Sequence, residues 1–158
     1  MTTRSKVAYP EPLSKNRLRL WLKLLKASSV IENEVRRRLR REFEATLPRF
    51  DVMSALSRCP NGLKMNQISQ LLRVSNGNIT GIVDRPTDER LALRVAVPGD
   101  RRADLERLTA KGLDELARQA EAHEGWINEM LDDLNAKDVD GINECLERLV
   151  ETLEQGEF

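Results

Sequence analysis

The chain has 158 residues, enough for one domain with a hydrophobic core of its own. Hydrophobic residues make up 40% and charged residues 33%, a composition that excludes a disordered tail. Its apolar runs are far shorter than the roughly 20 residues that cross a bilayer, and the N-terminus lacks the apolar region of a secretory signal. We therefore expect a single cytoplasmic domain over residues 1–158, with no membrane partner.

The charges are balanced overall but unevenly distributed. Residues 1–63 hold 14 basic and 6 acidic side chains, and residues 64–111 hold 9 and 6. Residues 112–158 reverse this bias, with 3 basic and 14 acidic side chains. A basic surface and an acidic surface therefore coexist, and the zero net charge does not exclude a polyanionic partner.

Residues 14–45 have apolar side chains at steps of three and four, which predicts one long helix. At the usual rise per residue this helix would extend for about 45 Å, so we expect part of its apolar stripe to face another chain. The helix also carries a cluster of arginines: Arg36, Arg37, Arg38, Arg40 and Arg41. We expect these to be solvated and partly paired with the acidic C-terminal helices of the same chain or its partner. A second nucleic-acid surface is the alternative.

Three short helices are predicted next, over residues 49–58, 64–73 and from Ser75 to about Asp84. Ser75 is a suitable N-cap, because its hydroxyl can accept a hydrogen bond from an unpaired backbone N–H. The second and third helices are separated by a tight junction, which is the spacing of a helix-turn-helix. The first of this pair would brace the second, which would present its polar positions to a groove of DNA.

Residues 93–108 alternate polar and apolar side chains on either side of a turn at residues 98–102, which predicts a β-hairpin with a basic tip. Thr109 is expected to cap a long helix that reaches Asn135. Residues 137–155 predict a last helix. The predicted fold class is therefore mainly α, with a small hairpin beside the helix-turn-helix.

Catalytic and metal chemistry have no candidate in this sequence. No nucleophile beside a base, no paired carboxylates in a cleft and no phosphate-binding glycine loop is apparent. His123, the single histidine, has no second Cys or His at metal-ligand spacing. Cys59 and Cys145 are expected to be buried, inert thiols, with redox sensing by Cys59 as the alternative. We expect neither an enzyme nor a bound cofactor.

Polar and basic side chains that could contact a duplex are concentrated in the predicted helix-turn-helix and hairpin. Short polar groups open the second helix of the pair, basic groups occupy its end and the hairpin tip, and two polar residues open the bracing helix. The candidates are Lys64, Asn66, Ser75, Asn76, Asn78, Thr80, Arg85, Arg101 and Arg102. Taken singly each of these is an ordinary surface residue, but helix, helix and basic hairpin in this order favour DNA binding.

Four segments resemble the MarR family of winged helix-turn-helix regulators: LPRFDVM at 47–53, VSNGNITGIVDR at 74–85, GDRRA at 99–103 and LTAKG at 108–112. The resemblance extends from about Leu18 to Leu153. It implies a homodimer whose terminal helices, 14–45 and 109–155, interlock, while residues 49–108 form the DNA-binding lobe. It also implies that the wing arginine, Arg102, is supported by Asp100. Such proteins usually repress transcription, and many release double-stranded DNA when a small aromatic or carboxylate effector binds.

The sequence departs from this family after Arg85, where Pro86 replaces a helix-forming residue and no glycine follows. Proline removes a backbone donor and clashes with the preceding turn, so we expect the helix to stop or kink near Arg85. The missing glycine also removes the usual left-handed C-cap. These changes leave open a second function, that of a helical dimer with weakened DNA affinity that binds a ligand or a protein.

Trp21 and Trp126 are candidates for an aromatic ligand pocket, with core or interface packing as the alternative.

Overall fold

The structure is a computed structural model that describes residues 11–156, including the side chains within that span except those of Asn76 and residues 101–103. The chain divides into two compact units, Met1–Ala45 and Thr46–Phe158. In the first unit, α1 spans Leu13–Phe43 and ends at Glu44, which adopts a left-handed conformation with φ of 51°. The long N-terminal helix predicted from the sequence is confirmed.

The clustered arginines Arg36, Arg37, Arg38 and Arg41 form ion pairs with glutamates of the same helix. Arg37 and Arg38 both donate to the carboxylate of Glu34, at 2.6 and 2.7 Å, and Arg36 lies 3.4 Å from Glu32. Arg41 pairs with the neighbouring Glu42 at 2.7 Å. The pairs of Arg36, Arg37 and Arg38 are local, because side chains three or four residues apart on a helix are direct neighbours. The expected pairing of some arginines with the C-terminal helices stays a prediction.

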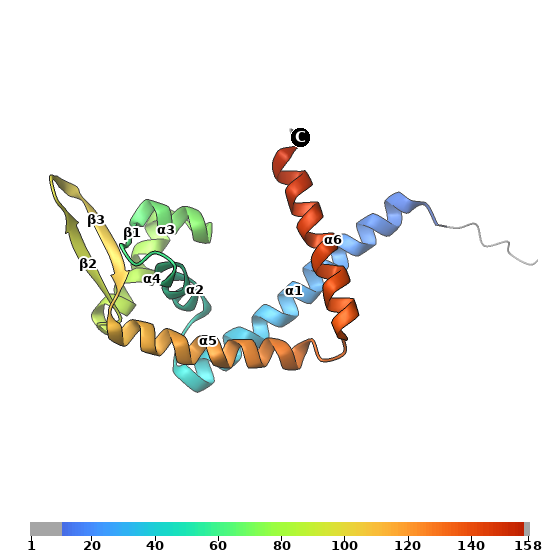
Figure 1. Cartoon of the computed structure of the whole chain (residues 1–158), viewed down its shortest axis with the longest axis horizontal. Helices are drawn as coiled ribbons and strands as arrows, with labels where there is room; N and C mark the ends of the chain where they lie inside the picture. The colour runs from blue at the N-terminus through green and yellow to red at the C-terminus, as the bar shows by residue number, and fades with distance from the viewer. Residues whose placement is uncertain (1–10, 157–158) are drawn as a thin grey trace, which may run out of the picture. The chain divides into compact units, whose positions relative to one another are not determined.

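The second unit begins with α2, Leu47–Ser57, which Thr46 caps by accepting from the N–H of Arg49 at 3.4 Å. It is followed by α3, Met65–Leu72, and α4, Asn76–Asp88. Figure 1 shows these three helices grouped beside the hairpin. They enclose a core to which the start of β2 also contributes: Val52, Ala55, Leu56, Leu63, Ile68, Ile79, Val83 and Ala92.

This unit also contains a three-stranded antiparallel sheet, with β1 at Leu63–Lys64, β2 at Ala92–Val97 and β3 at Asp100–Leu108, in the order β1-β3-β2. The sequence predicted the hairpin but not β1, which is too short to show a period. Gly62 leads into β1 with φ of 95°, and a β-carbon there would stand 2.8 Å from the Glu106 carbonyl oxygen. Glycine is therefore required for β1 to approach β3.

The hairpin turn is tighter than predicted. It consists of Pro98 and Gly99, whose φ of 85° favours glycine, and β3 already begins at Asp100. The pairing jumps from Ala96 opposite Asp104 to Val97 opposite Asp100, so residues 101–103 form a bulge in β3. The predicted five-residue turn was wrong: Arg101 and Arg102 belong to this bulge.

The sequence predicted that the helix would stop or kink near Arg85, and the predicted stop was wrong, because α4 continues through Pro86 to Asp88. Pro86 is buried, and Thr87 donates from its hydroxyl to the Val83 carbonyl at 3.0 Å, which supports the last turn. The left-handed position expected of a glycine is taken by Arg90, with φ of 62°. Packing of the proline ring and these hydrogen bonds outweigh the missing N–H.

Two further helices follow the sheet. In α5, Ala110–Met130, Thr109 caps the first turn by accepting from the N–H of Gly112 at 3.0 Å, as predicted. The helix ends at Met130 rather than at the predicted Asn135, because Asn135 is itself the N-cap of α6, Ala136–Gln155, in a reciprocal capping box with Asp138.

Candidate nucleic-acid interface

Helix α4 presents a polar face opposite a buried one. Ile79 and Val83 are at most 1% exposed and anchor the helix in the core, whereas Asn78 and Thr80 are exposed. Ser75 occupies the N-cap position, but its side chain makes no capping hydrogen bond, in contrast to the expectation. Asn76 begins the helix, and its side chain lies outside the described residues.

The bracing helix contributes two of the predicted residues. Lys64 and Asn66 are exposed at the start of α3, where the Lys64 N–H donates to the Gln67 side chain at 2.8 Å. Ser69, which sequence reasoning missed, is buried and donates from its hydroxyl to the Val74 carbonyl. This bond closes the junction between α3 and α4. A serine within an apolar stripe is the only local signal that could have indicated it.

The remaining predicted residues lie at the end of α4 and in the wing. Arg85 is exposed and bound to Glu89, one turn later, at 2.5 Å. Asp100 is exposed at the first position of β3. The side chains of Arg101 and Arg102 lie outside the described residues, so their predicted roles stay predictions.

A charged network, also missed from the sequence, joins the wing to α4. Glu106 of β3 is 0% exposed and accepts from Arg94 Nε at 2.6 Å, while Arg94 Nη2 donates to Asp84 of α4 at 2.6 Å. Burial raises the pKa of Glu106, and the hydrogen bond and charge of Arg94 oppose that rise. The pKa of Arg94 is raised, chiefly by its hydrogen bond to Glu106.

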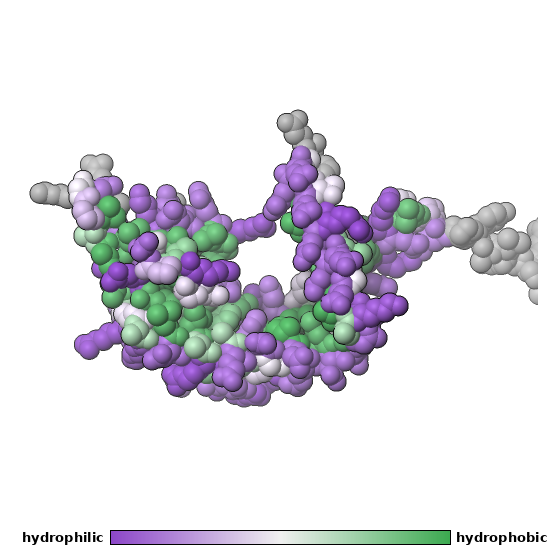
Figure 2. All heavy atoms as spheres, viewed as in Figure 1, coloured by the Kyte–Doolittle hydropathy of each residue, from purple (hydrophilic) through white to green (hydrophobic). Residues whose placement is uncertain are grey.

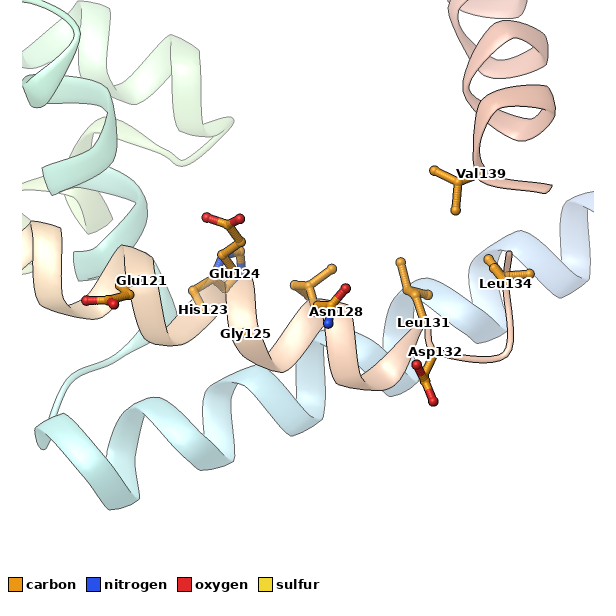
Figure 3. A pocket seen from close by; sticks show the side chains of 10 residues that line it. Glu121, His123, Glu124, Gly125, Asn128, Leu131, Asp132, Leu134 and Val139 are labelled. Atoms are coloured by element: carbon orange, nitrogen blue, oxygen red, sulfur yellow. The ribbon is translucent and has the colours of Figure 1, made fainter. Parts of the chain in front are cut away.

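A surface hollow of about 1000 Å³ lies where α5 leads into α6. In Figure 3 the side chains of Leu131 and Val139 point toward one another, and Asp132 points away. Carboxylates of Glu121 and Glu124 also belong to the lining, as does His123, whose ring lies 5.0 Å from that of Phe50. The hollow therefore combines an aliphatic wall with an acidic rim.

Of the two candidate tryptophans, Trp126 is buried at 7% exposure and is not among the residues that line this hollow. Trp21 of α1 is 55% exposed, and its predicted role in a ligand pocket stays a prediction. The predicted burial of both cysteines was wrong for Cys145, which is exposed on α6, whereas Cys59 is half-buried in the turn after α2.

Within residues 11–156, no helix combines the length and apolarity needed to span a membrane. Over the same span, no three His, Cys, Asp or Glu side chains are grouped as metal ligands.

No protein-family model matches the sequence. A curated relative, the HTH-type transcriptional regulator MhqR of Bacillus subtilis, is 32% identical over 85 residues, which cover 54% of this chain and 59% of that regulator. The match thus spans little more than half of the relative's length.

Solved structures match over most of the chain. A MarR family transcriptional regulator from Silicibacter pomeroyi is 28% identical, with a TM-score of 0.75 over 90% of this chain and 99% of that one. The regulator BldR from Sulfolobus solfataricus is 25% identical, with a TM-score of 0.74 over 87% and 99%. Sco3205 from Streptomyces coelicolor, solved in complex with DNA, shares the fold at 20% identity, with a TM-score of 0.76 over 95% and 94%. In its sequence motifs and its fold the chain is thus similar to MarR family regulators, and its architecture is that of a winged helix-turn-helix.

Proposed function

We propose that the chain is a DNA-binding transcriptional regulator, and that it represses transcription as a homodimer bound to a pseudo-palindromic site. The observation that carries the proposal is the two-sided construction of α4, which buries Ile79 and Val83 and leaves Asn78 and Thr80 exposed. A helix held in this way can enter a major groove with its polar side chains toward the bases. The bound DNA in the Sco3205 structure supports the same use of this fold.

The continuity of α4 favours DNA binding over the alternative function, a helical module with weakened DNA affinity. One reason for that alternative was that Pro86 would end the helix, and α4 instead reaches Asp88. Because β2 begins at Ala92, the wing that carries Arg101 and Arg102 follows α4 after only three residues. We assign them to the minor groove or its flanking phosphates.

The exposed apolar stripe of α6 supports a second copy of this chain as partner. Its apolar side chains are 37–50% exposed: Val139, Ile142, Leu146, Leu149, Val150 and Leu153. In Figure 2 hydrophobic side chains are visible among hydrophilic ones where α5 leads into α6. A continuous apolar stripe of this kind is unusual on a monomer and typical of an interface.

The charges of the terminal helices favour pairing α1 of one copy with α6 of the other. Residues 13–31 of α1 carry five basic and no acidic side chains, whereas α6 carries six acidic and two basic ones. The exposed apolar side chains of α1, among them Leu18, Trp21 and Leu22, would be covered in the same contact. Burial of the apolar side chains would provide the affinity of the dimer. The opposite charges would determine which helix of the partner each helix contacts.

DNA binding is tested by titrating the protein into a labelled duplex of its own upstream intergenic region at several salt concentrations. We expect affinity to fall steeply with salt, because binding releases counterions from phosphates. Asn78→Ala should weaken binding by about tenfold, the usual effect of one lost base contact, and Arg102→Ala should also lower the salt slope by about 1. Gln155→Ala, which removes an exposed amide of α6, is the matched control and should bind normally. Salt-independent or absent binding by the wild type would refute this function.

The dimer is tested by analytical ultracentrifugation at micromolar concentration. Leu146→Asp puts a charge into the apolar stripe and should yield monomers, whereas Gln155→Asp adds the same charge on the opposite face of α6 and should leave dimers intact. A monomeric wild type would contradict the proposal.

The most specific part of the proposal is that a small aromatic molecule acts as the effector. The acidic rim of the hollow beside α5 opposes a carboxylate by like charge, so we assign a neutral aromatic ligand to it. Phenol should raise the Tm and lower DNA affinity, whereas benzoate at the same concentration should do neither. The reverse preference would place the effector elsewhere.

A further inference from the structure

Glu106 occupies the central position of the winged lobe. It lies on the middle strand, opposite Leu63 of β1 on one side and Arg94 of β2 on the other. Its side chain is 0% exposed. A buried carboxylate at the centre of a small sheet is costly unless it is paired and hydrogen-bonded.

Arg94 provides that pairing and extends it beyond the sheet. Its Nε donates to Glu106 and its Nη2 donates to Asp84, each at 2.6 Å, so one guanidinium bridges two carboxylates. Asp84 belongs to α4, and Glu106 and Arg94 belong to the wing strands. The planar guanidinium fixes the angle between its two partners as well as their distance.

Thr87 makes a weaker contact from the same helix. Its hydroxyl lies 3.4 Å from Glu106 Oε2 but 3.0 Å from the Val83 carbonyl oxygen. A hydroxyl has one proton to donate, and the nearer acceptor is the carbonyl. Arg94 is therefore the principal link between Glu106 and α4.

The network of Glu106, Arg94 and Asp84 is better suited to fixing the position of the wing strands relative to α4 than to stabilising the fold. A buried ion pair contributes little compared with well-packed apolar side chains of similar volume. A leucine at position 106 would satisfy the core without the cost of burying a charge. A leucine could not accept the hydrogen bond from Arg94 that orients its guanidinium toward Asp84 of α4.

We infer that Glu106 is a positioning residue for DNA recognition: through Arg94 and Asp84 it sets the placement of the wing strands relative to the recognition helix α4. The inference rests on the proposed function, because the distance between these elements matters where both contact one duplex. A wing arginine reaches its groove only when the strands leave the lobe at the required angle. The buried carboxylate sets that angle at the base of the hairpin.

The test compares two variants that each remove one carboxylate from β3. Glu106→Gln removes the buried group, and Asp104→Asn removes an exposed one. Both make the strand less negative, so electrostatics alone would tighten DNA binding in both. We expect Asp104→Asn to bind as the wild type does or more tightly, and Glu106→Gln to bind about tenfold more weakly, with a salt slope lower by about 1.

The probe is a duplex of about 30 base pairs, selected by the wild type from a random library and long enough for two adjacent major-groove half-sites. Hydroxyl-radical footprinting should show that Glu106→Gln loses protection of the flanking minor grooves and keeps the central protection. Glu106→Asp, which retains the charge, should recover part of the lost affinity. Equal binding and footprints for Glu106→Gln and Asp104→Asn would overturn the inference.

Glu106→Leu separates positioning from folding. We expect it to melt at or above the wild-type Tm while binding the duplex as weakly as Glu106→Gln. If this variant binds the duplex with wild-type affinity, Glu106 only fills space in the core, and the inferred positioning role is wrong.

Hydrogen exchange without DNA separates this inference from the proposed function. Glu106→Gln should speed exchange of the β2 and β3 amides at least threefold relative to Asp104→Asn. If the wild type binds no duplex, the proposed function fails, but faster exchange would still establish the link between wing and α4. Unchanged exchange would refute that link by itself.

Discussion

A β-carbon at Gly112 would stand 1.9 Å from the carbonyl oxygen of Leu91, so the start of α5 and the start of β2 are in direct backbone contact. The same carbonyl accepts the N–H of Thr109 at 3.0 Å. Thr109 and Gly112 thus lie at the same junction, which explains why the LTAKG segment has threonine and glycine at these two positions.

Gly112→Ala should therefore destabilise the protein severely, by about 3 kcal/mol or more, because neither backbone can move aside. Gly125→Ala in the same helix has nothing within 4 Å of its new methyl and should be neutral or gain up to about 1 kcal/mol from helix propensity. Urea unfolding followed by circular dichroism measures both. A mild effect at Gly112 would mean that α5 does not pack on β2 this closely.

Arg90→Gly should stabilise the fold by about 1 kcal/mol, because Arg90 has φ of 62°, a conformation that costs other residues more than glycine. Arg90→Ala keeps the strained backbone and removes only an exposed side chain, so its unfolding free energy should stay near that of the wild type. Thermal melting compares the three proteins. If alanine stabilises as much as glycine, the arginine side chain is the source of the strain.

Glu34 should titrate far below the usual carboxylate range. Hydrogen bonds from Arg37 and then Arg38 lower its pKa from 4.5 to about 2. Its contribution to stability is therefore present above pH 4.5 and is lost as the pH falls from 4.5 to about 2. Side-chain carbonyl chemical shifts should show this midpoint in the wild type and a higher one in Arg37→Gln. Because the pair is exposed, added salt should weaken the shift.

Glu106 should give a pH dependence of the opposite sign. Its raised pKa means that the folded state binds the proton more readily than the unfolded chain, so its contribution falls as the pH rises through 4.5 toward the folded pKa. Glu106→Gln, which cannot titrate, should remove that slope from unfolding free energies measured between pH 4 and about 7, whereas Asp104→Asn should retain it. Parallel profiles for Glu106→Gln and the wild type would assign the slope to other groups.

Local sequence patterns predicted most of the fold. The spacing of apolar residues located all six helices, and the Thr109 cap was recognised from its own position in the chain. Helix ends depended on contacts that local patterns do not contain: α4 passes Pro86 because its ring is buried. The two residues of β1 form a strand only because Gly62 lets them approach β3.

The candidate site was predicted in outline. Exposed polar residues on α4 and α3 lie where the pattern placed them, as Asn78 and Lys64 illustrate. Glu106 was missed because a charged residue beside Arg107 in an alternating strand is read as surface. Its burial depends on Arg94 across the sheet and Asp84 on another helix, and such distant partners leave no trace in the spacing of neighbouring residues.

Thr109 has a mechanical consequence. Its hydroxyl donates to the Arg90 carbonyl at 2.7 Å and accepts from Gly112, while its own chain passes directly from β3 into α5. Only Thr109 separates the end of β3 from the start of α5 (Figure 1). We therefore expect a rotation of α5 to move the hairpin with it.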